Sequence, residues 1–401
     1  MERKILMIKE NENILNFFLE DGEIVEIHLS EAAEETRPAA LGDIYVGKVQ
    51  NIVANIGAAF IDIGGINCYY DISQAEHAIF TKKAGKKTLC IGDELLVQIS
   101  REAVKTKAPT VSSNISLTGR YAVLTSGNNR IGVSAKIPKS QRDEFKEKLS
   151  LLKNEDFGII VRTNAKDVSY DTLLEEIQKL EARFYHLKRT ALCRTCFSCL
   201  ETATKPYLTD LKNVYMDGLT EIIVEDDELY GEIEEYFEKE QPESLSLLRK
   251  YYDPMLPLAK LYSITTVMER ALNQRVWLKH GGYLIIQPTE AMTVIDVNSG
   301  KCISKKSHEK TCLEINMEAA EAIAAQIRLR NLSGIIIVDF INMEEEESMQ
   351  QLLTELRHHL AKDPIQTTLV DVTGLQLVEI TRKKLRRPLH ECRRKEWEKK
   401  N

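Results

Sequence analysis

The chain has 401 residues, of which 43% are hydrophobic and 29% are charged, and its formal net charge is −7. This length exceeds one ordinary domain, and no apolar run reaches the length that spans a bilayer. The acidic balance excludes a protein that binds nucleic acid through its overall charge, so such binding must depend on local basic patches or on a metal ion. The start does not resemble a secretory signal, and eight cysteines fit a reducing compartment, so we expect a cytoplasmic protein without a membrane span.

The first part of the chain has the texture of β-structure. Residues 1–37 alternate apolar and polar side chains around turns at 11–13 and 21–22, which predicts a β-hairpin. From 42 to 99, short apolar strands separated by glycines are typical of a small barrel of the OB type. Its aromatic residues and nearby lysines offer either a stacking face for single-stranded nucleic acid or ordinary barrel core: Tyr45, Phe60, Tyr69, Tyr70, Lys48 and Lys107.

A third segment, from 119 to about 200, begins with a predicted strand at 121–124 and ends with a charged helix at 170–189. Between them a strand ends at Arg162 and Thr163, a cation and a hydroxyl that suit a terminal phosphate, although a solvated strand end is the simpler interpretation. Further along, the pattern predicts a strand pair within 213–225 and helices at 226–240 and 263–277.

One cluster of cysteines stands out. Cys193, Cys196 and Cys199 follow one another at three-residue steps. Three thiols with one further ligand can hold zinc or an iron–sulfur cluster. No histidine nearby in the sequence completes such a set, which favours small apolar residues on one helix face.

Two aspartates each end an apolar, β-branched run. The runs are residues 292–300, which contain Asp296, and residues 334–340, which contain Asp339, and their continuous apolarity indicates strands buried on both faces. Between the two runs, apolar residues recur at helical spacing. We expect Ser307 to be the N-cap of this helix and Gly334 to follow its basic last turn. A single right-handed crossover would make the strands parallel and place both carboxylates at the same edge of the sheet.

Adjacent carboxylates repel unless something neutralises them. They can share a proton, as in an acid protease, or a hard divalent cation, as in phosphoryl-transfer sites. Asn298 lies two residues past Asp296, on the same strand face, where its amide can orient a carboxylate or a water ligand. This favours the metal interpretation; the alternative is that each aspartate only caps a strand end or a following helix.

The motifs around these residues resemble one family. Residues 287–300, 316–320, 326–330 and 334–341 read QPTEAMTVIDVNSG, NMEAA, QIRLR and GIIIVDFI. This set is similar to the catalytic core of the ribonuclease E/G family. The N-terminal half agrees in order, with GDIYVGKV at 42–49, AAFIDIG at 58–64 and ISLTGRY at 115–121, so the resemblance covers about residues 1–390.

The resemblance implies an α+β multidomain fold. An RNase H-like subdomain, formed by residues 1–38 and 208–271, would be interrupted by an OB-fold RNA-binding barrel at 39–118 and a 5′-sensor at 119–207. A DNase I-like catalytic α/β subdomain at 272–390 and a charged tail at 391–401 would follow. The hairpin at the start and the strands after 213 would then be the two pieces of the interrupted subdomain.

The resemblance also implies an activity. It is that of an endoribonuclease that cleaves single-stranded, A/U-rich RNA in RNA processing and decay, leaving 5′-phosphate and 3′-hydroxyl ends. Asp296 and Asp339 would hold magnesium, for which manganese can substitute, and Asn298 would orient the site. The implied RNA contacts are Phe60, Tyr70 and Lys107, and the implied 5′-monophosphate contacts are Gly119, Val123, Arg162 and Thr163.

Some positions depart from the family pattern. Ala135 and Gly374 stand where the family has basic residues, which leaves the strength of any 5′-monophosphate preference open. The family's C-terminal zinc link and small domain have no counterpart in this sequence, so zinc is not expected there and the oligomeric state is left open. Two other functions remain in view, a noncatalytic RNA-binding or regulatory relative and a metal-dependent DNase. Intact Asp296, Asn298 and Asp339 favour the enzyme.

Overall fold

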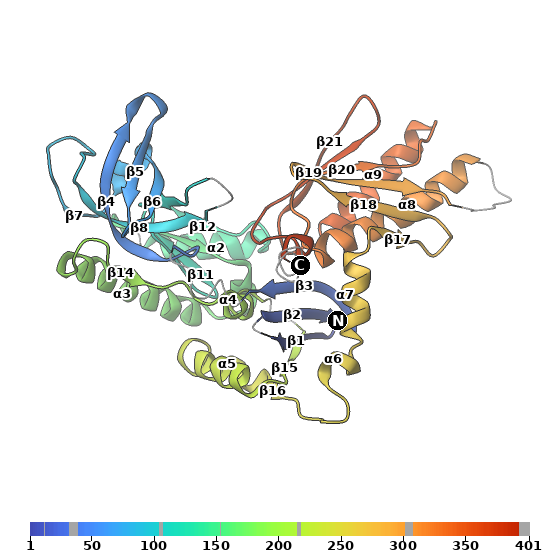
Figure 1. Ribbon diagram of the computed structural model, residues 1–401, viewed down its shortest axis with the longest axis horizontal. Coiled ribbons are helices and arrows are strands. Elements are labelled where there is room, and N and C mark those ends of the chain that lie inside the picture. The colour runs from blue at the N-terminus through green and yellow to red at the C-terminus, as the bar shows by residue number, and fades with distance from the viewer. Residues whose placement is uncertain are drawn as a thin grey trace. The chain divides into compact units, whose positions relative to one another are not determined.

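The computed structural model describes residues 1–11, 13–31, 39–103, 107–152, 154–214, 218–300 and 308–392. The backbone divides into two units, one formed by Met1–Ala32 with Gly218–Asn401 and the other by Ala33–Asp217 (Figure 1). Within the described residues, each unit contains two sheets. Helices and strands both contribute throughout, as a mixed α/β fold requires.

The first sheet of the first unit combines strands from the start of the chain with strands that follow Gly218. Strands β1 (Arg3–Glu10), β2 (Asn13–Glu20) and β3 (Glu23–Ser30) form an antiparallel meander, so the predicted hairpin is confirmed and gains a third strand. Strand β15 (Leu219–Val224) pairs with β1 in parallel, and β16 (Leu248–Lys250) pairs with β15. The strand pair predicted within 213–225 is wrong, because the described part of this stretch holds one strand that uses β1 as its partner.

Helices accompany this sheet. Helix α5 (Asp227–Glu240) begins where predicted, because the Asp226 carboxylate accepts a 2.8 Å hydrogen bond from the Leu229 amide. A 3₁₀ turn η4 (Pro242–Leu247), α6 (Leu258–Leu261) and α7 (Ile264–Leu272) follow. The helix predicted to reach residue 277 ends at Leu272, because the backbone becomes extended at Asn273 and residues 275–277 pair as a strand of the next sheet.

A buried ion cluster ties β3 to the long helix α8 (His308–Leu329) of the same unit. The Glu26 carboxylate accepts a 3.2 Å hydrogen bond from Arg328 Nε and lies 2.8 Å from His28 Nε2. Burial alone would raise the pKa of Glu26, but His28 and Arg328 outweigh it and lower that pKa to about 2. The carboxylate therefore stays ionised inside the protein.

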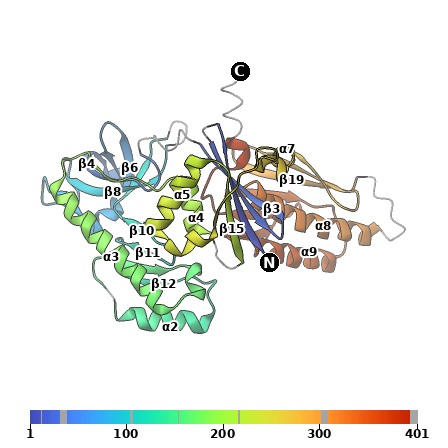
Figure 2. The ribbon, with the colours of Figure 1, turned by 90° about the horizontal axis from the view of Figure 1, so that it is seen from below.

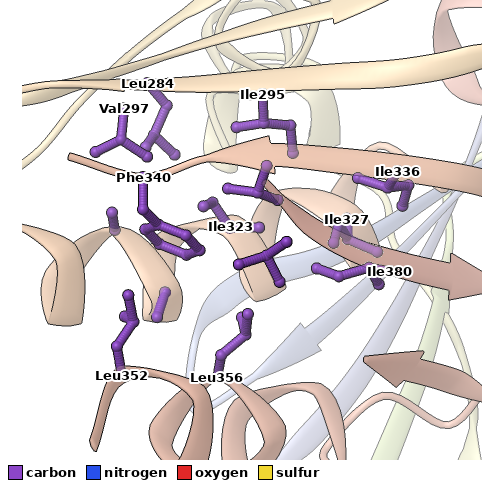
Figure 3. Packing of buried hydrophobic residues seen from close by; sticks show 14 of the residues in the cluster. Leu284, Ile295, Val297, Ile323, Ile327, Ile336, Phe340, Leu352, Leu356 and Ile380 are labelled. Atoms are coloured by element: carbon purple, nitrogen blue, oxygen red, sulfur yellow. The ribbon is translucent and has the colours of Figure 1, made fainter. Parts of the chain in front are cut away.

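The second sheet of this unit carries the predicted aspartates. Its order is β17 (Arg275–Trp277), β18 (Tyr283–Pro288), β19 (Met292–Asn298), β20 (Gly334–Asp339), β22 (Val378–Arg382) and β21 (Thr367–Val372). Helices α8 and α9 (Glu346–Leu360) pack on one face, where β18, β19 and β20 contribute Leu284, Ile295 and Ile336 (Figure 3). Along β19, Thr293, Ile295 and Val297 are buried, whereas the alternate residues are not.

The other face of this sheet is accessible, so the expectation of strands buried on both faces is wrong. We call it the open face; its central residues are Val294, Asp296 and Asn298 of β19 with Ile335, Ile337 and Asp339 of β20. Ile335 is 47% exposed. The continuous apolar run arises because branched residues occupy both sides of the pleat, not because both sides are covered.

Helix α8 ends differently from the prediction. Ser307 lies outside the described residues. At the other end the left-handed residue that follows the helix is Asn331, with φ of 50°, whereas Gly334, with φ of 84°, begins β20. The Asn331 N–H donates to the Arg328 carbonyl (3.1 Å) and the Leu332 N–H donates to the Ile327 carbonyl (3.0 Å), which is a Schellman motif. The Asn331 side chain also accepts a 2.6 Å hydrogen bond from buried Arg382, which explains an amide at this position.

The second unit contains a closed barrel. Strands β4 (Ile44–Val53), β5 (Ala58–Asp62), β6 (Asn67–Asp71), β9 (Thr110–Ser112) and β8 (Glu94–Arg101) pair in this order, and β8 pairs back to β4 (Figure 1). Strands β7 (Phe80–Lys82) and β14 (Cys199–Glu201) and the 3₁₀ turns η1 (Ala54–Ile56) and η2 (Ile72–His77) complete it. The five-strand closure agrees with the predicted barrel of the OB type.

The other sheet of this unit has the order β10 (Ser116–Thr118), β11 (Ala122–Thr125), β13 (Gly158–Val161) and β12 (Ile131–Val133). Helix α3 (Tyr170–Cys193) packs against it and α2 (Lys139–Ser150) lies beside β12 (Figure 2). The remaining elements are η3 (Thr163–Asp167) and α4 (Pro206–Asn213). The predicted strand at 121–124 and helix at 170–189 are confirmed within a few residues. No helix in the described part of the chain is both long enough and apolar enough to cross a membrane.

Candidate active site

The two aspartates lie side by side. Strands β19 and β20 run parallel, joined by α8 as the crossover, and their register pairs Asp296 directly with Asp339. Neighbouring strands are about 4.8 Å apart, so both carboxylates are within reach of one ion. Asp339 is exposed and Asp296 is half-buried, both on the open face at the carboxyl ends of their strands. The predicted juxtaposition is therefore confirmed.

Asn298 holds one of these carboxylates. Its Nδ2 donates a 2.7 Å hydrogen bond to Asp296 Oδ2, and both side chains emerge from the same face of β19. A hydrogen bond to a carboxylate oxygen is stronger than one between two neutral groups, and here it restricts rotation of the Asp296 side chain. The other carboxylate oxygen of Asp296 can then contact a different partner.

Buried residues on the opposite face of the sheet support the site. Leu284, Ile295 and Val297 point toward the helices, where they meet Ile323 of α8 and Leu352 of α9 (Figure 3). All five are at most 5% exposed. Because such a core is densely packed, the strand ends that carry the carboxylates have little freedom to shift.

A polar residue inside α8 fixes the chain just past Asp339. Asn316 is fully buried; its Nδ2 donates to the Ile341 carbonyl (2.8 Å) and its Oδ1 accepts from the Ile341 N–H (3.0 Å). Sequence reasoning did not assign this role. The signal was present, because an asparagine interrupting the apolar stripe of a helix must find partners for its amide when buried.

The residues present fit a hard divalent cation. Two carboxylates and an orienting amide supply the oxygen ligands and support that magnesium prefers, and such sites complete their octahedra with water and substrate oxygens. Among the described residues, no group of three or more His, Cys, Asp or Glu side chains is arranged to hold a metal.

The aromatic residues of the barrel divide into two sets. Phe60 and Tyr69, on neighbouring strands, are half-buried and meet edge to face with centroids 6.5 Å apart. Tyr70 points inward, because successive strand residues face opposite sides; it is fully buried and its hydroxyl lies 2.9 Å from Ser113 Oγ. Burial raises the pKa of Tyr70 to about 12.

This placement corrects one expectation. Tyr70 belongs to the barrel core and presents no ring to a base in this structure, whereas Phe60 remains available with Tyr69 beside it. Lys107 is exposed. The aromatic pair and this lysine are therefore accessible on the outside of the barrel.

Three of the four residues expected at a 5′-phosphate lie around the end of β13. Arg162 Nη1 donates to the Gly119 carbonyl and Nη2 to Asn213 Oδ1, both at 2.7 Å, and Thr163 Oγ1 lies 2.9 Å from Ser134 Oγ. Val123 is on the adjacent strand, paired with Ile160. Burial lowers the pKa of Arg162, and the charge of a carboxylate opposes that shift.

That carboxylate is Glu176, which sequence reasoning missed. It accepts hydrogen bonds from the backbone N–H groups of Arg120, Tyr121 and Ala122 at 3.0, 2.7 and 2.8 Å. A row of converging backbone donors is a common anion site, and here an internal anion occupies it. A glutamate on the inward side of α3 was the only sequence signal.

The cysteine cluster does not lie on one helix face, so that interpretation is wrong. Helix α3 ends at Cys193 because Arg194 is extended, Cys196 lies in the following turn, and Cys199 begins β14, which pairs with β4. Burial raises the pKa of Cys196 and of Cys199. Within the described chain these thiols join no group arranged for a metal.

Comparison with known proteins identifies the family. The family model described as Ribonuclease E/G family matches residues 116–385. Ribonuclease E of Synechocystis sp. is 31% identical over 397 residues, which is 97% of this chain and 58% of that protein. Ribonuclease G of Salmonella typhimurium and of Escherichia coli K12 are each 31% identical over 384 residues, 92% of this chain and 77% of those proteins. The chain thus spans little more than half the length of ribonuclease E, and it belongs to the ribonuclease E/G family.

Proposed function

We propose that this chain is a magnesium-dependent endoribonuclease that hydrolyses phosphodiester bonds of single-stranded RNA at the Asp296–Asp339 pair. The observation that carries the proposal is the direct register pairing of these two aspartates on an accessible sheet face. The relatives named ribonuclease E and ribonuclease G support RNA as the substrate. The products would be 5′-phosphate and 3′-hydroxyl ends, and the setting RNA processing and decay in the cytoplasm.

Each of the three site residues has one role in this proposal. When bound, magnesium, or manganese in its place, neutralises charge that develops on the phosphate and makes water a nucleophile at neutral pH. Asp296 and Asp339 bind the ion, and Asn298 holds Asp296 in the orientation that binding requires. No protein nucleophile is needed. The open face allows the strand of RNA to approach the pair directly.

Substrate choice would follow from strandedness. Unpaired bases can be splayed and stacked on aromatic rings, as Phe60 offers on the barrel, while Lys107 contacts phosphate. An A/U-rich preference fits segments that remain unpaired. A 5′-monophosphate near Gly119, Val123, Arg162 and Thr163 would add a second anchor and raise the effective concentration of RNA at the cutting site.

The test is cleavage of an unstructured, A/U-rich oligoribonucleotide in the presence of magnesium. Asp296→Asn and Asp339→Asn should each lose at least about 100-fold in rate, since an amide is a far weaker ligand for a hard cation. Glu234→Gln is the matched control, because Glu234 is an exposed carboxylate of α5, in the same unit but outside this sheet. Undiminished cutting by either site variant would overturn the proposal.

The same assay separates the other two functions. A noncatalytic relative would bind the oligoribonucleotide without cutting it, whatever ion is supplied. A metal-dependent DNase would cut the deoxy analogue at least as fast as the ribo strand. Comparing 5′-monophosphate and 5′-hydroxyl versions of the substrate then measures the contribution of the residues around Arg162.

A further inference from the structure

The open face carries a second feature, at its β17 edge. Trp277 of β17 pairs across the strands with Tyr283 of β18, and their ring centroids are 5.3 Å apart. The guanidinium of Arg275 lies 5.5 Å from the Trp277 ring centroid and 4.7 Å from that of Tyr283. We call these three residues the aromatic platform.

The platform is unusually accessible. Trp277 is 65% exposed, and Arg275 is exposed as well. The pairing of Trp277 with Tyr283 across the two strands can stabilise an edge strand. That role does not require the indole ring of Trp277 to be exposed to water. An exposed indole beside a cation is, however, the combination that stacks nucleobases and contacts phosphates in proteins that bind single strands.

Register places the platform beside the aspartate pair. Trp277 pairs with Tyr283 and Tyr283 with Asn298, while Arg275 pairs with Ile285 and Ile285 with Asp296. Residues paired across a sheet share a face, so the platform and the carboxylates lie on the same side. Two strand spacings, about 10 Å, separate β17 from the strand of Asp296, and Asp339 lies one strand further along the sheet. A neighbouring nucleotide of the same RNA strand can span the distance to Asp296.

The platform is also held in place from behind. The turn between β17 and β18 is anchored to α8, where the Glu318 carboxylate accepts from the backbone N–H of Lys279 and of His280 and lies 2.9 Å from His280 Nδ1. The opposite face of β17 contributes Val276 to the same core as the aspartate strands. The platform and the site are therefore parts of one packed layer.

We propose that the aromatic platform stacks one unpaired base of the RNA strand being cut, next to the nucleotide at Asp296 and Asp339, while Arg275 contacts the adjoining phosphate. This rests on the proposed function, because it takes the aspartate pair as the cutting site. The ligand is an unpaired nucleobase in a single strand. Stacking accepts every base, so the platform sets the path of the strand and not its sequence.

Binding is tested without turnover by fluorescence. The chain has two tryptophans, so Trp397→Phe leaves Trp277 as the sole indole, and Asp339→Asn suppresses cutting. Titration with an A/U-rich oligoribonucleotide should quench Trp277, whereas an abasic ribose-phosphate strand of equal length should not. No quenching by the oligoribonucleotide, or equal quenching by both strands, would overturn base stacking.

Kinetics supply the second readout. In the otherwise unaltered chain, Trp277→Ala should raise KM for the oligoribonucleotide by roughly 5- to 100-fold with little change in kcat, and Trp277→Tyr should restore most of the loss. Tyr252→Ala is the matched control, because Tyr252 is 82% exposed and lies in the same unit away from this sheet. An unchanged KM for Trp277→Ala, or a rise that tyrosine does not rescue, would overturn the platform.

The two proposals fail in different ways. If Trp277→Ala behaves like the parent while Asp296→Asn is inactive, the platform is wrong and the cutting site stands. If Asp296→Asn still cuts while an oligoribonucleotide quenches Trp277, the cutting site lies elsewhere, and the platform no longer guides a strand to this pair.

Discussion

Two adjacent isoleucines of β20 test whether the aspartate pair lies on an open face. Ile336 is 0% exposed and packs in the core against α8, whereas Ile335 is 47% exposed and faces the same side as Asp339. Truncation to alanine removes the same atoms from the same strand in both cases, so strand propensity changes equally. Only the burial of the lost atoms differs.

The expected magnitudes follow from that burial. Ile336→Ala loses the full transfer free energy and leaves a cavity, which costs about 2–5 kcal/mol in the free energy of unfolding. Ile335→Ala loses only about half of a transfer term of roughly 1.5–3 kcal/mol and leaves no enclosed cavity, so it should cost about 1 kcal/mol. The difference, about 2 kcal/mol, corresponds to a factor of roughly 30 in the folding equilibrium.

Denaturant unfolding measures this difference. Because the chain has two units, a global probe would mix their transitions, so the fluorescence of Trp277 in a Trp397→Phe background is followed instead. Trp277 belongs to the same sheet as both isoleucines and reports the transition that matters. Equal destabilisation by the two substitutions would refute the reasoning, because it would mean that the aspartate face is covered in solution.

Three further outcomes are expected. Asn298→Ala should lower kcat by about 10- to 100-fold with unchanged thermal unfolding, since it removes only the 2.7 Å bond to the carboxylate; a rise in KM alone would contradict this. Phe60→Ala should weaken oligoribonucleotide binding by about 1–3 kcal/mol in an anisotropy titration, whereas Tyr70→Ala should destabilise the barrel by about 3–5 kcal/mol in a thermal melt; the reverse pattern would count against the assigned sides. Glu26 has a folded-state pKa lowered from 4.5 to about 2, so its ionisation stabilises the fold above pH 4.5 and this contribution disappears as pH falls toward 2. Glu26→Gln should therefore be destabilising at neutral pH and progressively less so across that range in urea unfolding, and a pH-independent difference would rule out the linkage.

Much of the site could be predicted from residue patterns. Two β-branched runs, each ending in aspartate and separated by one helix, leave the parallel crossover as the simple connection, and the strands do pair Asp296 with Asp339. Period-two spacing also places Asn298 on the face of Asp296, where its amide bonds to the carboxylate. Local rules were sufficient because these contacts join neighbours along one strand or across one crossover.

Other features depend on partners that no local pattern reveals. Whether Tyr69 or Tyr70 faces the barrel core depends on strand register, and the apolar runs of β19 and β20 gave no sign that one face is accessible. The amide side chain of Asn331 at the end of α8 bonds to Arg382, which lies far along the chain.

Residue patterns alone were enough to predict the strands that carry Asp296 and Asp339, the crossover between them and the pairing of the two carboxylates, because hydrophobic period and chain connectivity are local properties. Three-dimensional contacts were needed to show which side of each strand is covered, that Glu176 fills a row of backbone donors, and that Trp277, Tyr283 and Arg275 share a face with the aspartates. Burial and register arise from contacts between segments distant in sequence, and a one-residue shift in pairing would reverse every face.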